Sequence, residues 1–128
     1  MTNAGGASIA DGGTLIITPD PSQGVATNVT ATIKNLGTTN LTVSGITTAN
    51  TSNVTINSVT GGTGTITPGA SATVTINYTV TAAGAFSFDL DIVSDDADEA
   101  NYDILVTGGA LLTAEINVKS NTGASIAD

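Results

Sequence analysis

Hydrophobic and polar residues alternate along most of the chain. In residues 72–80 every second side chain is hydrophobic, and the residues between them are Thr and Asn. Residues 86–92 repeat the pattern, with Phe, Leu and Ile set between Ser and Asp. Because successive side chains of a strand point to opposite faces, this alternation predicts strands with one buried face. Weaker alternation or short apolar runs predict further strands at residues 15–17, 28–34, 41–48, 54–59, 102–107 and 114–118.

Short clusters rich in Gly, Pro and Asn separate these runs, at residues 19–21, 35–37, 61–64, 68–69 and 83–84. Gly adopts the positive φ of tight turns without strain, and Asn35 can cap a turn with its side chain. Short half-buried strands at this spacing, without helical periodicity, predict an all-β, immunoglobulin-like Greek-key β-sandwich of seven to eight strands. A closed barrel is the alternative architecture.

One six-residue sequence occurs near both ends of the chain. Residues 6–11 and residues 123–128 both read GASIAD, 117 residues apart (Gly6 to Gly123). The echo marks either the boundaries of one repeat in a longer array or equivalent joints in a head-to-tail assembly. We therefore predict a linker or joint at residues 1–13, the sandwich at residues 14–110, and a terminal strand and linker at residues 111–128, equivalent to the start of a next repeat.

The composition limits both the core and the surface. The chain has 128 residues and is 40% hydrophobic, but it contains only two Phe, two Tyr and no Trp. Val, Ile, Leu and Ala must therefore fill most of the core. Charged residues make up 10% of the chain, against roughly 25% in typical soluble domains. A surface of Thr, Ser, Asn and Gly is common in exported proteins, so we expect an extracellular or cell-surface location.

The charge balance narrows the choice of partners. Eleven acidic residues against two Lys give a net charge of −9. Nucleic acids and anionic membranes bind proteins through clusters of Lys and Arg, so neither is an expected partner. The chain lacks an apolar run of roughly 18 residues, which predicts no membrane insertion. Its first residues do not read as a signal peptide, so export would need a signal that is removed or belongs to a longer precursor.

The residue inventory argues against catalysis. Without His or Cys, a Ser or Thr nucleophile would need Lys34 or Lys119 as its base, and neither lies in an S-x-x-K sequence. Asp89 and Asp91 resemble a glycosidase carboxylate pair, but alternation places both on the outer face of one strand. We expect the protein not to be an enzyme.

Calcium is the one metal that the sequence suggests. Ca²⁺ takes six to eight oxygen ligands from carboxylates and carbonyls. The chain offers a cluster of acids in one loop and on the strands beside it: Asp91, Asp95, Asp96, Asp98, Glu99 and Asp103. The spacing lacks the glycine and terminal Glu of an EF-hand, so solvated, turn-forming acids are the alternative. No other cofactor is expected.

Four segments resemble a known family of repeats. Residues 33–43 (IKNLGTTNLTV) and 66–76 (ITPGASATVTI) are similar to two strand-and-turn motifs of bacterial choice-of-anchor D repeats, which are relatives of abnormal-spindle/hydin-type immunoglobulin-like domains. Residues 90–102 (LDIVSDDADEANY) are similar to a third motif, with Ala97 and Ala100 where the family has Pro. Residues 115–128 resemble the opening of such a repeat.

The resemblance implies a structural role and carries over no catalytic residue. Such repeats serve as spacers and adhesive stalks in large secreted or surface proteins. By analogy, an assembly strand opens the next repeat; it comprises Ala114, Glu115, Ile116, Asn117 and Val118. A sandwich that lacks an edge strand exposes unpaired backbone groups. The assembly strand could complete its own domain or a neighbouring one by strand addition.

These observations predict a non-enzymatic extracellular structural module. It would act as a tandem-repeat spacer or as a self-assembling, strand-exchanging filament subunit, with copies of itself or neighbouring repeats as partners. The first alternative is an adhesive module that binds glycan or protein ligands, although the chain shows no aromatic platform. The second is an intracellular anchoring domain of the hydin type, which fits poorly with the low charge.

Overall fold

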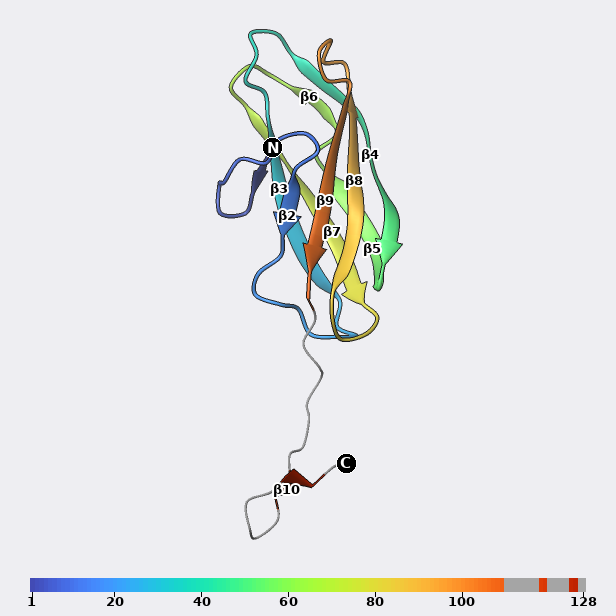
Figure 1. Ribbon diagram of the computed structural model, residues 1–128. Coiled ribbons are helices and arrows are strands. Elements are labelled where there is room, and N and C mark those ends of the chain that lie inside the picture. Colours follow the sequence, from blue (N-terminus) through green and yellow to red (C-terminus); the bar gives the residue numbers. More distant parts are fainter. Residues whose placement is uncertain (110–117, 120–124, 127–128) are drawn as a thin grey trace.

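Two β-sheets pack face to face in the computed structural model, which describes residues 1–109, 118–119 and 125–126 (Figure 1). The four-stranded sheet has the order β1 (Thr2–Asn3), β3 (Thr27–Lys34), β7 (Ser71–Val80), β5 (Val54–Gly61). The five-stranded sheet has the order β2 (Thr14–Ile16), β9 (Asn101–Gly108), β8 (Phe86–Ser94), β4 (Leu41–Ser52), β6 (Gly64–Ile66). Among these nine described strands, only β2 and β9 pair in parallel.

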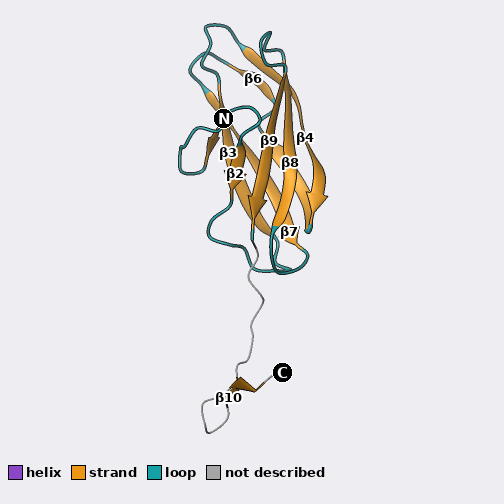
Figure 2. Cartoon of the chain, in the orientation of Figure 1, coloured by secondary structure: helices purple, strands orange, loops and turns teal. Residues whose placement is uncertain are grey.

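The predicted all-β sandwich is confirmed. Strands and loops account for all the described residues in Figure 2, and none of these residues forms a helix long and apolar enough to span a membrane. The sandwich has nine strands instead of seven to eight because β1 and β6 were not expected. With two and three residues, these strands are too short for alternation to be visible in the sequence.

The core follows the alternation of β7 and β8. Tyr78, Phe86 and Phe88 are each no more than 1% exposed. The rings of Tyr78 and Phe86 stack with their centroids 5.5 Å apart. Aliphatic side chains from both sheets surround this aromatic centre: Leu15, Ile33, Val43, Val74, Ile76, Val80, Leu90, Ile92, Ile104 and Val106. Three of the four aromatic residues of the chain therefore lie at the middle of the core.

The chain crosses from one sheet to the other between β4 and β5. Asn53 lies at this crossing with a φ of 57°, in the left-handed region where L-residues are strained. Its amide donates hydrogen bonds to the carbonyls of Ala82 (2.8 Å) and Ala85 (3.3 Å), and Thr81 Oγ1 donates to Asn53 Oδ1 (2.8 Å). One side chain therefore ties the crossing to the loop between β7 and β8.

Short strands occur near both ends of the chain. Residues 1–13, predicted as a linker or joint, contribute β1 and place Ile9 in the core at 7% exposure. Near the other end, β10 (Val118–Lys119) and β11 (Ser125–Ile126) form a separate two-stranded antiparallel sheet. Of the predicted assembly strand, Val118 lies in β10, and residues 114–117 lie outside the described residues.

Candidate functional site

The first nine residues form a tight hairpin. Thr2 bridges Ser8 in antiparallel fashion, and the amide of Ile9 donates to the Met1 carbonyl at 2.7 Å. Asn3 closes the turn because its backbone N–H donates to the Ala7 carbonyl (3.0 Å) and its side-chain oxygen accepts from the Ala7 amide (2.9 Å). The hairpin therefore has its own hydrogen bonds before it contacts the sandwich.

The hairpin docks on the sandwich through a short ladder and one tyrosine. In the pairing of β1 with β3, Thr2 lies opposite Thr32 and Asn3 lies opposite Ala31. The Tyr102 hydroxyl donates to the Ile9 carbonyl and accepts a 3.4 Å hydrogen bond from the Met1 amino group. Tyr102 therefore joins both arms of the hairpin to β9.

Burial changes the ionisation of the groups at this joint. It lowers the pKa of the Met1 amino group, and the nearby Glu99 carboxylate opposes that effect. Burial, aided by the charges of Glu99 and Asp11, raises the pKa of Tyr102. The phenol therefore stays protonated at neutral pH and can donate to the Ile9 carbonyl.

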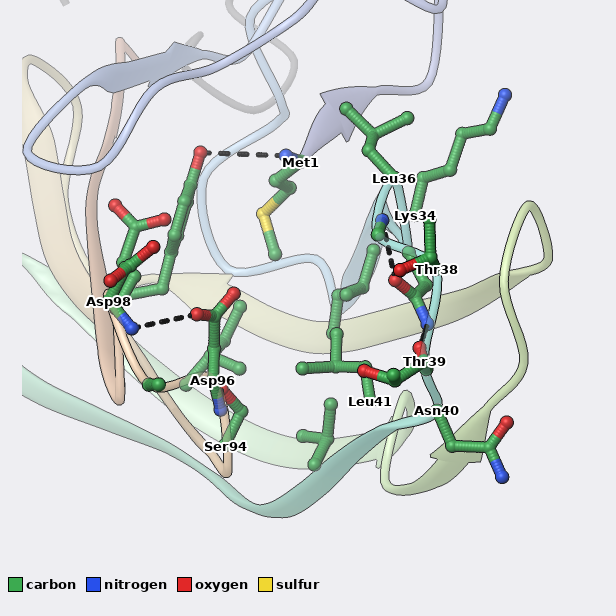
Figure 3. Close-up of a pocket in the computed structure, with 18 residues that line it drawn as sticks. Met1, Lys34, Leu36, Thr38, Thr39, Asn40, Leu41, Ser94, Asp96 and Asp98 are labelled. Atoms are coloured by element: carbon green, nitrogen blue, oxygen red, sulfur yellow. Dashed lines mark hydrogen bonds between the residues drawn. The ribbon is translucent and has the colours of Figure 1, made fainter.

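An open groove of about 620 Å³ lies beside Met1 at one end of the sandwich. The loop of residues 35–40 forms one wall, and the loop after β8 forms the other. Figure 3 shows the Met1 side chain pointing between Asp96 on one side and Leu41 on the other. Buried or half-buried apolar side chains line the inside: Met1, Ile33, Leu41, Val43, Ile92 and Tyr102.

Asn35 holds the first wall in place. It is 5% exposed, and its amide nitrogen donates to the carbonyls of Thr39 (2.7 Å) and Ile66 (2.8 Å). Its side-chain oxygen accepts from the Gly37 amide at 2.9 Å. The prediction that Asn35 caps a turn is confirmed, and the loop is fixed by three hydrogen bonds to one buried side chain. At the rim beyond it, Leu36 is 84% exposed.

The second wall carries acidic residues that are engaged with the loop itself. The Asp96 carboxylate accepts from the Asp98 amide at 2.9 Å. The Asp95 carboxylate accepts from the Thr42 amide at 2.7 Å, and this backbone hydrogen bond lowers the pKa of Asp95. The loop is therefore anchored to β4 and presents Asp98 and Glu99 toward the groove.

The six acids predicted as calcium ligands divide into two groups. Asp91 and Asp103 lie directly opposite each other on β8 and β9. Partial burial, followed by the charges of Asp103 and Asp89, raises the pKa of Asp91. The other four lie in the loop after β8, namely Asp95, Asp96, Asp98 and Glu99. Within residues 1–109 and the two short C-terminal strands, no three acidic side chains are grouped as a metal site. Calcium binding by this set stays a prediction.

Sequence reasoning missed the groove because two loops and the first hairpin build it jointly. The available signal was the GASIAD echo, since its first copy contains Ile9, which anchors the hairpin in the core. Two residues weighed and rejected for catalysis have clear positions in the structure. Asp89 accepts a 2.6 Å hydrogen bond from the Asn50 amide, and Lys34 is exposed at the end of β3.

Solved structures support the fold at low sequence identity. A PapD-like domain of human CEP192 (PapD-like domain 7) is 11% identical with a TM-score of 0.58, covering 79% of this chain and 82% of that one. A protein of unknown function from Porphyromonas gingivalis W83 is 20% identical with a TM-score of 0.59, over 75% of this chain and 43% of that one. The secreted serine protease VesC from Vibrio cholerae is 19% identical with a TM-score of 0.54, over 84% of this chain and 24% of the protease.

The sequence comparison identifies the family. The search of curated proteins found no match for the chain. Residues 21–108 match the family described as HYDIN/CFA65/VesB-like, Ig-like domain, whose fold is generally non-catalytic. The narrower resemblance to choice-of-anchor D repeats stays a prediction. Because the match covers most of the chain, this protein belongs to the HYDIN/CFA65/VesB-like family of immunoglobulin-like domains.

Proposed function

We propose that the protein is a non-enzymatic structural module of an extracellular or cell-surface protein, joined end to end with neighbouring domains. The joining is either covalent, as a spacer repeat in a tandem array, or by strand exchange between copies in a filament. The membership of a structural domain family supports the first half of this statement. The low charge and the secreted character of the VesC protease support an extracellular setting.

The observation that carries the proposal is a repeated hairpin. Thr2 pairs with Ser8 at the start of the chain, and Lys119 pairs with Ser125 near its end. The second pair lies 117 residues after the first, which is also the spacing between the two GASIAD sequences. The chain therefore contains one sandwich with its docking hairpin and a second copy of that hairpin, which is what an end-to-end joint requires.

Measuring the mass distribution tests the proposal. The purified chain would be examined by size-exclusion chromatography with light scattering over a wide concentration range, with negative-stain microscopy of each fraction. We expect multimers whose masses are multiples of 12.5 kDa, lengthening with concentration. A strictly monomeric species at all concentrations would eliminate strand exchange and leave the tandem spacer. Mass that tracks an added glycan or protein ligand would favour the adhesive alternative.

A further inference from the structure

The groove beside Met1 is an acceptor site for the assembly strand of a second copy of this chain: we propose that Ile116 of the donor copy fills it. This inference rests on the end-to-end joining proposed above and names the surface and the side chain that would make it. In the bound state, the donor hairpin at residues 118–126 takes the place of the acceptor hairpin at residues 1–9. Residues 114–117 then continue the strand beyond Met1.

The register of the two hairpins sets which residues correspond. Val118 lies opposite Ile126 and Lys119 lies opposite Ser125. In the first hairpin the same positions are held by Met1 with Ile9 and by Thr2 with Ser8. Val118 is therefore the counterpart of Met1, and Ile126 is the counterpart of the core residue Ile9. Both replacements are aliphatic, so the donor hairpin suits the same docking site.

Strand parity then directs Ile116 into the groove. Met1 points into the groove, and side chains two positions apart on a strand lie on the same face. Ile116 precedes Val118 by two positions, so it would lie next to the position of Met1, above Ile33 and Val43. A volume of about 620 Å³ leaves ample room for one isoleucine side chain. Ile116 of the donor would therefore cover apolar side chains at the inside of the groove that Met1 covers only in part.

The outward face of the strand is complementary in charge. The β1–β3 register, extended beyond Met1, places Asn117 opposite Lys34 and Glu115 opposite Leu36. Figure 3 shows the side chains of Lys34, at the end of β3, and Leu36, in the loop that follows, both pointing away from the acidic loop. Glu115 would therefore lie diagonal to the Lys34 ammonium, within reach for a long side chain. Its methylene groups would cover Leu36, which is 84% exposed.

Chain length excludes the protein's own groove as the acceptor. β9 runs from Tyr102, which contacts Met1, to Gly108, about 20 Å away at the opposite end of the sandwich (Figure 1). A strand that enters as β1 does must place Ala114 beyond Met1, about 33 Å from Gly108. The six steps from Gly108 to Ala114 span at most about 22 Å. The donor strand must therefore come from another copy.

Cysteine pairing tests the register directly, since the chain has no Cys of its own. Glu115→Cys chains would be mixed with Leu36→Cys chains under mild oxidation and separated on a non-reducing gel. We expect a disulfide-linked heterodimer, because directly opposed residues on paired strands lie within disulfide reach. The control replaces Leu36→Cys with Val25→Cys, which is also exposed but lies just before β3, at the end away from the groove. Equal linkage of both partners would overturn the inference.

A second experiment separates the groove from assembly in general. Ile116→Asp should weaken self-association at least ~100-fold, and Ile116→Val should stay within ~10-fold of the parent. Asn117→Asp is the matched control, because it adds the same charge one position away, on the outward face near Lys34. Equal weakening by both Asp variants would overturn the groove assignment. If Ile116→Asp forms multimers as readily as the parent chain, self-assembly occurs but does not use this groove. If the parent chain is itself monomeric, both self-assembly and the groove assignment are wrong.

Discussion

Replacing Asn35 with alanine tests whether one buried side chain holds the loop wall of the groove. The substitution removes two donated hydrogen bonds, to the carbonyls of Thr39 and Ile66, and the bond accepted from the Gly37 amide. The Thr39 and Gly37 groups are part-buried, so water can reach them and each lost bond costs about 0.5–1 kcal/mol. The Ile66 carbonyl is buried and would be left unpaired, at a cost of about 1–3 kcal/mol.

Asn35→Ala should therefore lower the free energy of unfolding by about 2–5 kcal/mol, a large part of the stability of a domain this size. Urea unfolding followed by far-UV circular dichroism measures this change, because the chain has no Trp for fluorescence. Asn57→Ala is the matched control. It also removes two donated hydrogen bonds, to Asn77 Oδ1 (2.8 Å) and Thr79 Oγ1 (2.9 Å), but these are exposed, so its cost should stay within about 0.5 kcal/mol. Equal costs for the two variants would refute the reasoning.

Three further predictions concern the crossing and the acidic residues. Asn53→Gly should destabilise less than Asn53→Ala by about 1 kcal/mol in urea melts, since only Gly adopts the positive φ freely once the side-chain bonds are lost. Asp91→Asn should raise the free energy of unfolding by about 0.3–0.5 kcal/mol at neutral pH, because burial and then the charge of Asp103 raise the Asp91 pKa, so its ionised form opposes folding. A variant no more stable than the parent chain in urea melts would contradict this. The lowered pKa of Asp95 means that its ionised carboxylate stabilises the fold above the ordinary pKa of 3.8, and this stabilisation is lost as the pH falls through the folded-state pKa. The Tm of the parent chain should therefore exceed that of Asp95→Asn at neutral pH, and the difference should shrink at acidic pH.

The long strands could be predicted because their burial is regular. β7 and β8 alternate over ten and nine residues, which is long enough for a two-residue period to stand out. β1 and β6 could not be predicted from two or three residues, since their positions depend on pairing partners far along the chain. β1 meets β3 because Ile9 and Tyr102 hold the hairpin in place, and neither contact is visible as a local pattern.

Only part of the candidate site could be predicted from the sequence. The acids were correctly seen as neighbours in sequence, but the β8–β9 ladder separates Asp91 and Asp103 from the loop, where Asp95 is bound to Thr42. The GASIAD echo did indicate that the two ends are equivalent. It could not show a groove, because the walls come from loops at residues 35–40 and 95–100 that meet only after both sheets have formed.

The few contacts of the first hairpin explain how it could be exchanged for the hairpin of another copy. β1 makes only two ladder pairs with β3, whereas β7 pairs with β3 along eight positions. An element held by few pairs opens at lower cost than the central strands, so the hairpin can leave without unfolding the core. A hairpin from another copy can then use the same contacts, provided it presents an aliphatic residue at the position of Ile9. Ile126 meets that condition. Ile116 would add a contact that the resident hairpin lacks, so the donor hairpin should be favoured over the resident one at this site.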